Sequence, residues 1–568
     1  MATITGINSL DALLKSSWAS SAGTAVTLTY SFLTTSPAGA TTTDANGFKP
    51  MTAAQQAAVK VALDSWAAVA DITFTQVSSG GDLQVGTNNQ GDDSSAYAYL
   101  PGGRGPVYMY TNNTYAPGST YAAGDFGASV LIHEFGHTLG LKHPGNYDST
   151  GGATDGPFLP AATDNLDFTQ MSYNTGSGFS LNGNYGVTPM QFDIQAIQYM
   201  YGANMAYHTG ADTYSFVRDS ALQCIWDAGG TDTLDFSACT GATIINLNQG
   251  NFSSTAPGYN NISIAYNVTI ERAIAGSGGS TIHGNDAGNV IIGGIRSDTV
   301  YLGKGSDTVT GGGGGDTVVF DLALASYGFS GSKAALTVTG EGTDLLNNIS
   351  TLKFDDRTIQ LSNYISLSGG GAGDDKLVAG TGNELFSGGT GFDTVHYSLA
   401  RSNYTVAASG KAFTVGDKSV SGGTDLVAGV ERLEFSDGSG VALDIAGAAG
   451  QTYRLYQAAF NRKPDLGGLS FWLDKMDDGL GLASMAQFFL NSKESVAIYA
   501  LLTDAQFVAQ VYTNVLHREP DTGGLDFYIK GMAAGVTRAA VLADFSESAE
   551  NQAAVIGSIT NGINYTVF

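Results

Sequence analysis

Two periods of apolar residues predict helices and strands in the first third of the chain. Alternation of apolar and polar residues over 26–32 and 106–111 predicts two half-buried strands. Over 52–70, apolar residues fall at i, i+4 and i+7 behind a capping Thr52, so we expect an amphipathic helix there. A mixture of this kind predicts an α+β domain over residues 1–205.

A third period, of nine residues, follows in a glycine-rich region. Between 276 and 315, 14 of 40 residues are glycine. An apolar residue recurs two positions after a polar one: Ile291, Val300, Val309 and Val318 follow Asn289, Asp298, Asp307 and Asp316. This repeat is typical of a parallel β-roll, with six residues in a turn, where glycine supplies positive φ, and three in a strand. We expect a roll over 206–320; the alternative, a flexible linker, would not keep the apolar period.

A shorter set with the same spacing lies further along the chain. Asp375, Glu384 and Asp393 are again nine apart, although Glu384 departs from the aspartate pattern. Around this set, the segment 342–356 (Gly-Thr-Asp-Leu-Leu…Leu-Lys-Phe-Asp-Asp) recurs in similar form at 423–437. Residues 321–447 are therefore predicted to form a β-rich duplicated module with a second short β-roll.

The last predicted domain is helical and also repeats. Arg-Lys-Pro-Asp-Leu-Gly-Gly-Leu-Ser-Phe at 462–471 recurs as Arg-Glu-Pro-Asp-Thr-Gly-Gly-Leu-Asp-Phe at 518–527, 56 residues later. Residues 448–568 are predicted to be all-α, and they resemble a helical repeat domain of secreted and surface-layer bacterial proteins. Two interpretations stay open: a cell-surface attachment module, or a packing and export-supporting domain without a partner.

Charge and composition restrict the function. Lys and Arg number 25 against 51 Asp and Glu, a net charge of −26 in a chain that is only 13% charged. Nucleic-acid binding is disfavoured because phosphate contacts need basic residues. Two cysteines, Cys224 and Cys239, which could pair or stay free, are too few for a disulfide scaffold or a thiolate zinc finger. No run of about 18 apolar residues is present, so no membrane span is expected.

The segment 131–143, Leu-Ile-His-Glu-Phe-Gly-His-Thr-Leu-Gly-Leu-Lys-His, carries the predicted chemistry. His133 and His137 are four apart, so a helix places both imidazoles on one face, as a zinc site requires. Gly140 can end the helix with positive φ and bring His143 round as the third ligand. Three protein ligands leave one position open, which is the catalytic pattern, and Glu134 can act there as general acid and base.

This segment resembles the metzincin pattern H-E-x-x-H-x-x-G-x-x-H, and Met-Ser-Tyr at 171–173 is similar to the Met-turn of the serralysin branch. The resemblance implies that Met171 forms an apolar floor below one catalytic Zn²⁺. It also implies that Tyr173 is a labile fourth zinc ligand that can swing away and stabilise the transition-state oxyanion. A protease fold retained after loss of activity is the alternative, and the intact motif disfavours it.

The resemblance extends to calcium. Residues 226–236 and 267–274 look like the serralysin lead-in to its roll, and an upstream turn would add the His208 carbonyl. Ordinary β-turn chemistry is the alternative explanation for such Asp-Gly turns. Oxygen ligands suit Ca²⁺, and unneutralised stacked carboxylates repel, so folding is expected to need calcium. The expected structural calcium ligands are His208, Gly210, Asp212, Asp227, Gly229, Gly230, Asp232, Thr269, Glu271, Asp286, Asn289, Asp298, Asp307, Asp316, Asp375 and Asp393.

The chain shows no basic segment followed by a long apolar one at its start, so a cleaved signal peptide is not expected. Serralysin-like proteins leave Gram-negative bacteria through a type I exporter that reads an uncleaved C-terminal signal. The resemblance therefore implies an extracellular protein, with the apolar end at 564–568 as part of that signal. Little room precedes Leu10 for the family's prosegment.

These expectations combine into one prediction: a multidomain, secreted, calcium-stabilised zinc endopeptidase that hydrolyses proteins or peptides. Its parts are an α+β metzincin catalytic domain, a parallel calcium-binding β-roll, a duplicated β module and an all-α domain carrying the export signal. The alternative is a calcium-dependent cell-surface or surface-layer binding protein with a vestigial protease fold. A secreted lipase is disfavoured because residues 1–205 lack G-x-S-x-G.

Overall fold

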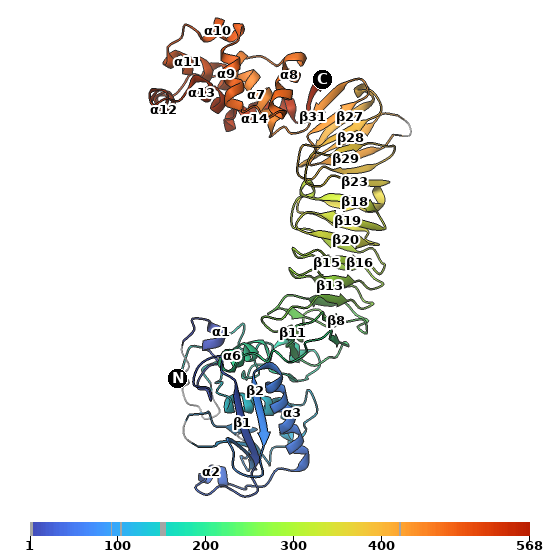
Figure 1. Cartoon of the computed structure of the whole chain (residues 1–568). Coiled ribbons are helices and arrows are strands. Elements are labelled where there is room, and N and C mark those ends of the chain that lie inside the picture. Colours follow the sequence, from blue (N-terminus) through green and yellow to red (C-terminus); the bar gives the residue numbers. More distant parts are fainter. Residues whose placement is uncertain (1–3, 93, 103–104, 148–154, 420–421, 568) are drawn as a thin grey trace. The chain divides into compact units, whose positions relative to one another are not determined.

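The computed structural model describes residues 4–92, 94–102, 105–147, 155–419 and 422–567. These form two compact units, Met1–Val319 and Phe320–Phe568, and Figure 1 follows both along the chain. Cys224 and Cys239 are both buried free thiols. No helix among the described residues is both long and apolar enough to cross a membrane.

The first unit begins with a five-stranded sheet in the order β2-β1-β3-β5-β4. Its strands are parallel except β4, which pairs antiparallel with β5 at the edge. The predicted strands at 26–32 and 106–111 correspond to β1 and β5. The bounds are β1 (Val26–Phe32), β2 (Ile72–Gln76), β3 (Leu83–Asn88), β4 (Ala96–Ala98) and β5 (Val107–Asn112).

Three longer helices accompany this sheet: α3 (Ala53–Val69), α4 (Phe126–Thr138) and α6 (Gln191–Tyr201). The predicted helix at 52–70 is confirmed as α3, and Thr52 caps it by accepting a hydrogen bond from the Gln55 amide. α3 packs against α4 through Trp66, which is fully buried and donates its indole N–H to the Ile132 carbonyl at 3.1 Å. Short helices are α1 (Asn8–Asp11), α2 (Thr42–Ala45), η1 (Ala116–Ser119) and α5 (Ser177–Ser180).

The rest of the first unit is a parallel roll with two stacks of short strands. Strands β7 (Gln223–Ile225), β10 (Phe252–Ser253) and β11 (Ile262–Ile264) form a small sheet beside it. One stack contains β6 (Thr213–Ser215), β8 (Thr233–Asp235), β12 (Arg272–Ile274), β14 (Val290–Ile292) and β16 (Thr308–Thr310). The other contains β9 (Thr243–Asn246), β13 (Ser280–His283), β15 (Thr299–Tyr301) and β17 (Thr317–Val319).

The nine-residue period becomes the core of this roll. Ile291 is in register with Val309 in one stack, and Val300 with Val318 in the other. All four side chains are at most 1% exposed. The apolar residue of each repeat therefore faces the core of the roll.

The glycines of these turns have a different main use from the predicted one. Within 276–315, positive φ occurs only at Gly279, Gly313, Gly314 and Gly315. Most others are needed because successive turns lie close together: a Cβ on Gly294 would come within 1.8 Å of the Gly276 carbonyl oxygen. A Cβ on Gly303 or on Gly312 would lie 2.0 Å from a carbonyl oxygen of a neighbouring turn. Tight stacking, more than left-handed backbone, explains this composition.

The second unit begins with β strands. An antiparallel set comprises β18 (Gly328–Ser332), β19 (Ala335–Thr339) and β20 (Thr343–Asn347), and a hairpin joins β21 (Thr351–Lys353) to β22 (Thr358–Gln360). Two further sheets follow in the orders β23-β25-β29-β28-β27 and β24-β26-β30-β31-β32. Their first three strands are parallel, as expected for the second short roll. Their bounds are β23 (Ser366–Gly369), β24 (Lys376–Val378), β25 (Glu384–Ser387), β26 (Thr394–Tyr397), β27 (Tyr404–Ser409), β28 (Ala412–Asp417), β29 (Thr424–Ala428), β30 (Arg432–Phe435) and β31 (Ser439–Ala442).

Helices fill most of the remainder, as predicted from residue 448 onward. Asp465 and Asp521, equivalent in the two repeats, cap α8 and α12 by accepting from Gly468 and Gly524. The helices are α7 (Ala448–Phe460), α8 (Leu466–Asp477), α9 (Leu482–Leu490), α10 (Lys493–Tyr499), α11 (Asp504–Val511), a π-helix η5 (Tyr512–Leu516), α12 (Thr522–Ala533), α13 (Arg538–Ser546) and α14 (Ala549–Ile559).

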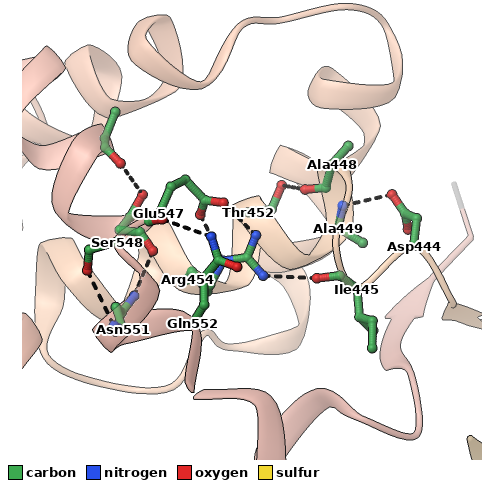
Figure 2. A network of polar contacts seen from close by, with 12 residues as sticks. Asp444, Ile445, Ala448, Ala449, Thr452, Arg454, Glu547, Ser548, Asn551 and Gln552 are labelled. Carbon is green, nitrogen blue, oxygen red and sulfur yellow. Dashed lines mark hydrogen bonds and ion pairs between the residues drawn. The ribbon is translucent and has the colours of Figure 1, made fainter. Parts of the chain in front are cut away.

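A polar network joins the first helix of this region to the last two (Figure 2). Arg454 of α7 binds Glu547 at the end of α13 through two hydrogen bonds, of 2.8 and 2.6 Å, and also donates to the Ile445 carbonyl. The Arg454 side chain is 5% exposed and that of Glu547 is 23% exposed. The ion pair is therefore largely withdrawn from solvent and links α7 to the end of α13.

The last described residues return to a sheet. Strand β32 (Ile563–Thr566) pairs antiparallel with β31, and Ile563 and Tyr565 are buried. Most of the predicted C-terminal export segment at 564–568 thus lies in a sheet edge, while Phe568 lies outside the described residues.

Candidate metal centre

Helix α4 and the turn after it bring three histidines together. His133 and His137 lie one helical turn apart with ring centroids separated by 4.8 Å. The Nε2 atom of His143 lies 3.2 Å from Nε2 of His133 and 3.0 Å from Nε2 of His137. The convergence of three imidazole nitrogens predicted from the sequence is therefore confirmed.

The turn that delivers His143 depends on Gly140. Its φ is +109°, and a Cβ there would lie 2.0 Å from the Ser16 carbonyl oxygen. The amide of Lys142 donates to the Leu13 carbonyl at 2.7 Å, so the N-terminal segment braces this turn. The predicted positive φ at Gly140 is confirmed, and the close approach of residue 16 is an additional reason for glycine.

Two histidines are oriented by their second ring nitrogens. His133 Nδ1 lies 2.7 Å from the Gln170 carbonyl, and His137 Nδ1 lies 2.8 Å from the Leu141 carbonyl. These contacts place the proton on Nδ1 and leave the Nε2 lone pairs available to a cation. Burial lowers the pKa of His133, as do the neighbouring histidines, and burial lowers the pKa of His137 to about 4. Neutral imidazoles of this kind fit a Zn²⁺ ion.

A second layer of contacts holds the carbonyl that orients His133. The buried Asp193 carboxylate accepts from the Gln170 amide at 2.7 Å and from the Met190 amide at 2.8 Å. Thr169 Oγ1 donates to the same carboxylate at 2.5 Å. Asp193 therefore fixes the backbone at 169–170. No sequence motif identifies Asp193 for this role.

Glu134 lies between the histidines in sequence and faces the adjacent cleft. It is 6% exposed, and its Oε2 has no hydrogen-bond partner among the described residues. Burial raises its pKa to about 8. An unpaired, proton-accepting oxygen beside the histidines fits the predicted general acid and base.

Met171 and Tyr173 flank the histidines as the Met-turn resemblance implied. Met171 is fully buried, and a Cβ on Gly136 of α4 would come within 2.5 Å of its sulfur. Tyr173 is 51% exposed, and its ring centroid lies 4.5 Å from that of His143. Ligation of zinc by Tyr173 stays a prediction.

A cleft of about 500 Å³ opens beside this centre. Edge strand β4 contributes Ala96, and Tyr173 forms part of the wall. The other lining residues are Asp92, Ser94, Ser95, Tyr115, Phe126, Ser129, Val130, His133, Glu134, Leu166, Gln170, Ser172, Thr175 and Tyr185. His133 and Glu134 therefore both face this cleft.

The expected lead-in calcium residues partly converge. Ligand atoms of His208, Asp212 and Asp227 lie within 4.8 Å of one another. The His208 imidazole lies 3.0 Å from the Asp212 carboxylate, whereas the resemblance implied that the His208 carbonyl is the group that binds calcium. Asp232 is fully buried with one oxygen, Oδ2, unpartnered among the described residues, and Glu271 accepts from its amide at 2.8 Å. Gly230 packs against the Gly210 carbonyl, while Gly229 has φ of +138° and Thr269 is exposed.

Along the roll, the aspartates form a regular ladder. Asp298 accepts from the Ser280 amide at 2.5 Å, and Asp316 accepts from the Asp298 amide at 2.9 Å, each 18 residues apart. The same contact joins Asp393 to the Asp375 amide in the second unit. The Asn289 amide donates to Asp307 in the same way, whereas the exposed Asp286 accepts from the backbone amide of Lys304. Calcium binding at these positions stays a prediction.

Three family models match parts of the chain. Residues 25–150 match the family model "Matrixin", and residues 191–438 match "Peptidase M10 serralysin C terminal". A "Domain of unknown function (DUF4214)" matches twice, at 452–499 and 486–555. The helical region therefore resembles a family without an assigned role.

Several curated proteins are similar to the chain. Metallopeptidase AprA of Pseudomonas marginalis is 39% identical over 293 residues, 47% of this chain and 61% of that protein. Metalloprotease AprA of Pseudomonas entomophila (strain L48) is 36% identical, covering 47% and 60%, and serralysin of Proteus mirabilis is 37% identical, covering 42% and 55%. The chain thus spans about 60% of the length of the first relatives it matches.

Proposed function

We propose that the chain is a serralysin-type metzincin, on the matches of residues 25–150 and 191–438, and that it is a secreted, calcium-stabilised zinc endopeptidase acting on proteins or peptides. The observation that carries the proposal is the convergence of His133, His137 and His143 at their Nε2 atoms beside Glu134. Because Nδ1 of His133 and Nδ1 of His137 are held by carbonyls, the nitrogens facing the centre are free to coordinate.

The donor set fits zinc: three imidazoles leave an open position. A Zn²⁺ ion there would supply a Lewis acid that polarises a peptide carbonyl and acidifies water. Glu134 is placed to take a proton from the attacking water and to return it to the leaving nitrogen. Its unpartnered oxygen and raised pKa both favour that exchange.

Tyr173 has the proposed role of stabilising developing negative charge on the carbonyl oxygen. Its ring lies beside His143 and lines the cleft, so its hydroxyl can approach a chain bound there. One preorganised donor at such a position contributes about 10²–10³ in rate. The half-exposed ring leaves room for the movement that this role needs.

Calcium is proposed to hold the roll together. The stacked aspartates need a cation to neutralise them, since Asp232 and Asp393 each have a buried oxygen that no described residue hydrogen-bonds. Export through a type I system would match this need, since a roll without calcium would stay open until it left the cell. The helical region is proposed either to attach the protein to a cell surface or to support folding.

The test is Glu134→Gln, which keeps the size of the side chain and removes its basicity. Caseinolytic activity is expected to fall by about 10²–10⁴ while bound zinc, measured by elemental analysis, stays at the wild-type level. Glu384→Gln is the matched control because Glu384 is 7% exposed, as buried as Glu134, but lies in the second unit. Unchanged activity in Glu134→Gln would refute the enzymatic proposal.

Chelation separates the two metals. Removal of metals with EDTA is expected to abolish activity, zinc alone to restore little, and zinc with calcium to restore it. Binding to cell envelopes by a protein that cleaves nothing under zinc and calcium would favour the surface-binding alternative.

A further inference from the structure

A second tyrosine, Tyr147, lies beside Tyr173. It follows His143 by four residues, and its ring stacks on that of Tyr173 with centroids 5.0 Å apart and planes 28° from parallel. Its ring is also 5.8 Å from that of His143. Tyr147 therefore provides an aromatic wall for a side chain that is otherwise half exposed.

The Tyr147 hydroxyl is tied to a buried carboxylate. It donates to Asp164 Oδ1 at 2.6 Å, and the Ser172 hydroxyl donates to the same oxygen at 2.7 Å. The amide of Tyr173 points at the Tyr147 hydroxyl at 3.4 Å. One carboxylate, 8% exposed, thus connects the stacking ring to the residue just before Tyr173.

Two other contacts show that this arrangement is closely packed. A Cβ on Gly145 would lie 2.0 Å from the Tyr147 ring and 2.6 Å from Asp164 Oδ2, so only glycine lets the Tyr147 ring lie there. Asn174 donates its side-chain amide to the Asp164 carbonyl at 2.9 Å. The residues on both sides of Tyr173 are therefore anchored to Asp164 through their side chains.

We propose that Tyr147 is a positioning residue that holds the ring of Tyr173 beside the histidines, with Asp164 and Ser172 fixing Tyr147 in turn. The inference rests on the proposed function, which gives Tyr173 its role. Tyr147 acts through Tyr173 and touches no reacting atom. Its ring provides the stacking surface, and its hydroxyl provides the anchor.

A double-mutant cycle tests the dependence on Tyr173. Tyr173→Phe is expected to lower kcat by about 10²-fold, and Tyr147→Leu to lower kcat about 10-fold or more with little change in KM. In the Tyr173→Phe background, Tyr147→Leu is expected to cause no further loss. Additive losses would overturn the proposal. Tyr147→Phe, which keeps the ring, is expected to retain activity within about threefold, and Tyr199→Leu serves as a control for loss of a tyrosine elsewhere in the unit.

A spectroscopic measurement separates this inference from the proposed function. Copper(II) bound in place of zinc gives a charge-transfer absorption when a tyrosine phenolate reaches it, and Tyr173→Phe defines the background. Tyr147→Leu is expected to lose at least half of this absorption, Tyr147→Phe to keep most of it, and thermal unfolding without metal confirms that the variants fold. If Tyr173→Phe retains full activity, the proposed catalytic role of Tyr173 fails, but an unaltered copper spectrum in Tyr147→Leu is what overturns the positioning role.

Discussion

Replacing one inward-facing residue of the roll is expected to change how much calcium the protein needs to fold. Val309 is 1% exposed on β16, in register with Ile291 of β14. Val309→Ala removes two methyl groups, each worth about 0.8 kcal/mol of transfer free energy. With the cavity left behind, the free energy of folding is expected to weaken by about 2–3 kcal/mol.

That loss converts into a measurable calcium shift. About 2.5 kcal/mol corresponds to a roughly 70-fold change in the folding equilibrium. If folding is coupled to two calcium ions, the calcium concentration at half-folding rises about 8-fold, and if to four ions about 3-fold. Circular dichroism of the full chain during calcium titration measures this midpoint.

The matched control is Ile292→Ala, on the strand paired with β16, where the side chain is 37% exposed. It removes more atoms than Val309→Ala but is expected to move the midpoint less than about twofold, because little buried area is lost. Equal shifts in both variants would refute the claim that the nine-residue period builds the core. Native roll structure at zero calcium would refute the calcium coupling itself.

Three further changes test other contacts. Burial, together with nearby carboxylates, raises the pKa of Asp232 to about 6, so protonation of Asp232 stabilises the calcium-free roll at low pH and this stabilisation is lost as pH rises through about 6. Because the proton competes with calcium, the calcium affinity measured by titration should fall up to about tenfold per pH unit below 6. A calcium affinity that does not change with pH would contradict this. Gly136→Ala should displace the Met171 sulfur, lower kcat and reduce the free energy of unfolding, measured by denaturant titration, by about 1–3 kcal/mol. A more stable, fully active variant would show that Met171 can move aside without loss of function. Arg454→Ala leaves the Glu547 carboxylate unpaired and should destabilise the helical region by about 3 kcal/mol in hydrogen exchange without changing peptide hydrolysis; unchanged protection would mean that the ion pair contributes nothing.

The metal-centre histidines were predictable because their spacing is local. Four residues separate His133 from His137 on one helix face, and Gly140 then dictates the turn that returns His143. The roll was predictable for the same reason: a nine-residue period repeats one local structure along the chain. In both cases the geometry follows from neighbours in sequence.

The contacts that orient the site were not predictable because they join distant residues without a period. Asp193 holds Gln170 from 23 residues away, and Asp164 holds Tyr147 from 17 residues away. A single aspartate in a mixed segment carries no signal of which backbone amide it will meet. The main reason for the roll glycines was not predictable either, because the close contact of successive turns, such as that of Gly294 with the Gly276 carbonyl, depends on how the turns stack in space.

The ladder of aspartates also indicates where calcium is needed most. Asn289 pairs both of its polar atoms within its own turn, accepting from the Asn285 amide at 2.8 Å and donating to Asn285 Oδ1 at 2.9 Å. Asp393, at an equivalent place, is fully buried with Oδ2 unpartnered among the described residues. A neutral, self-paired side chain needs no cation, whereas a buried carboxylate oxygen without a partner is costly until one arrives. The demand for calcium is therefore expected to be uneven along the stacks, weakest at Asn289 and strongest at positions such as Asp393.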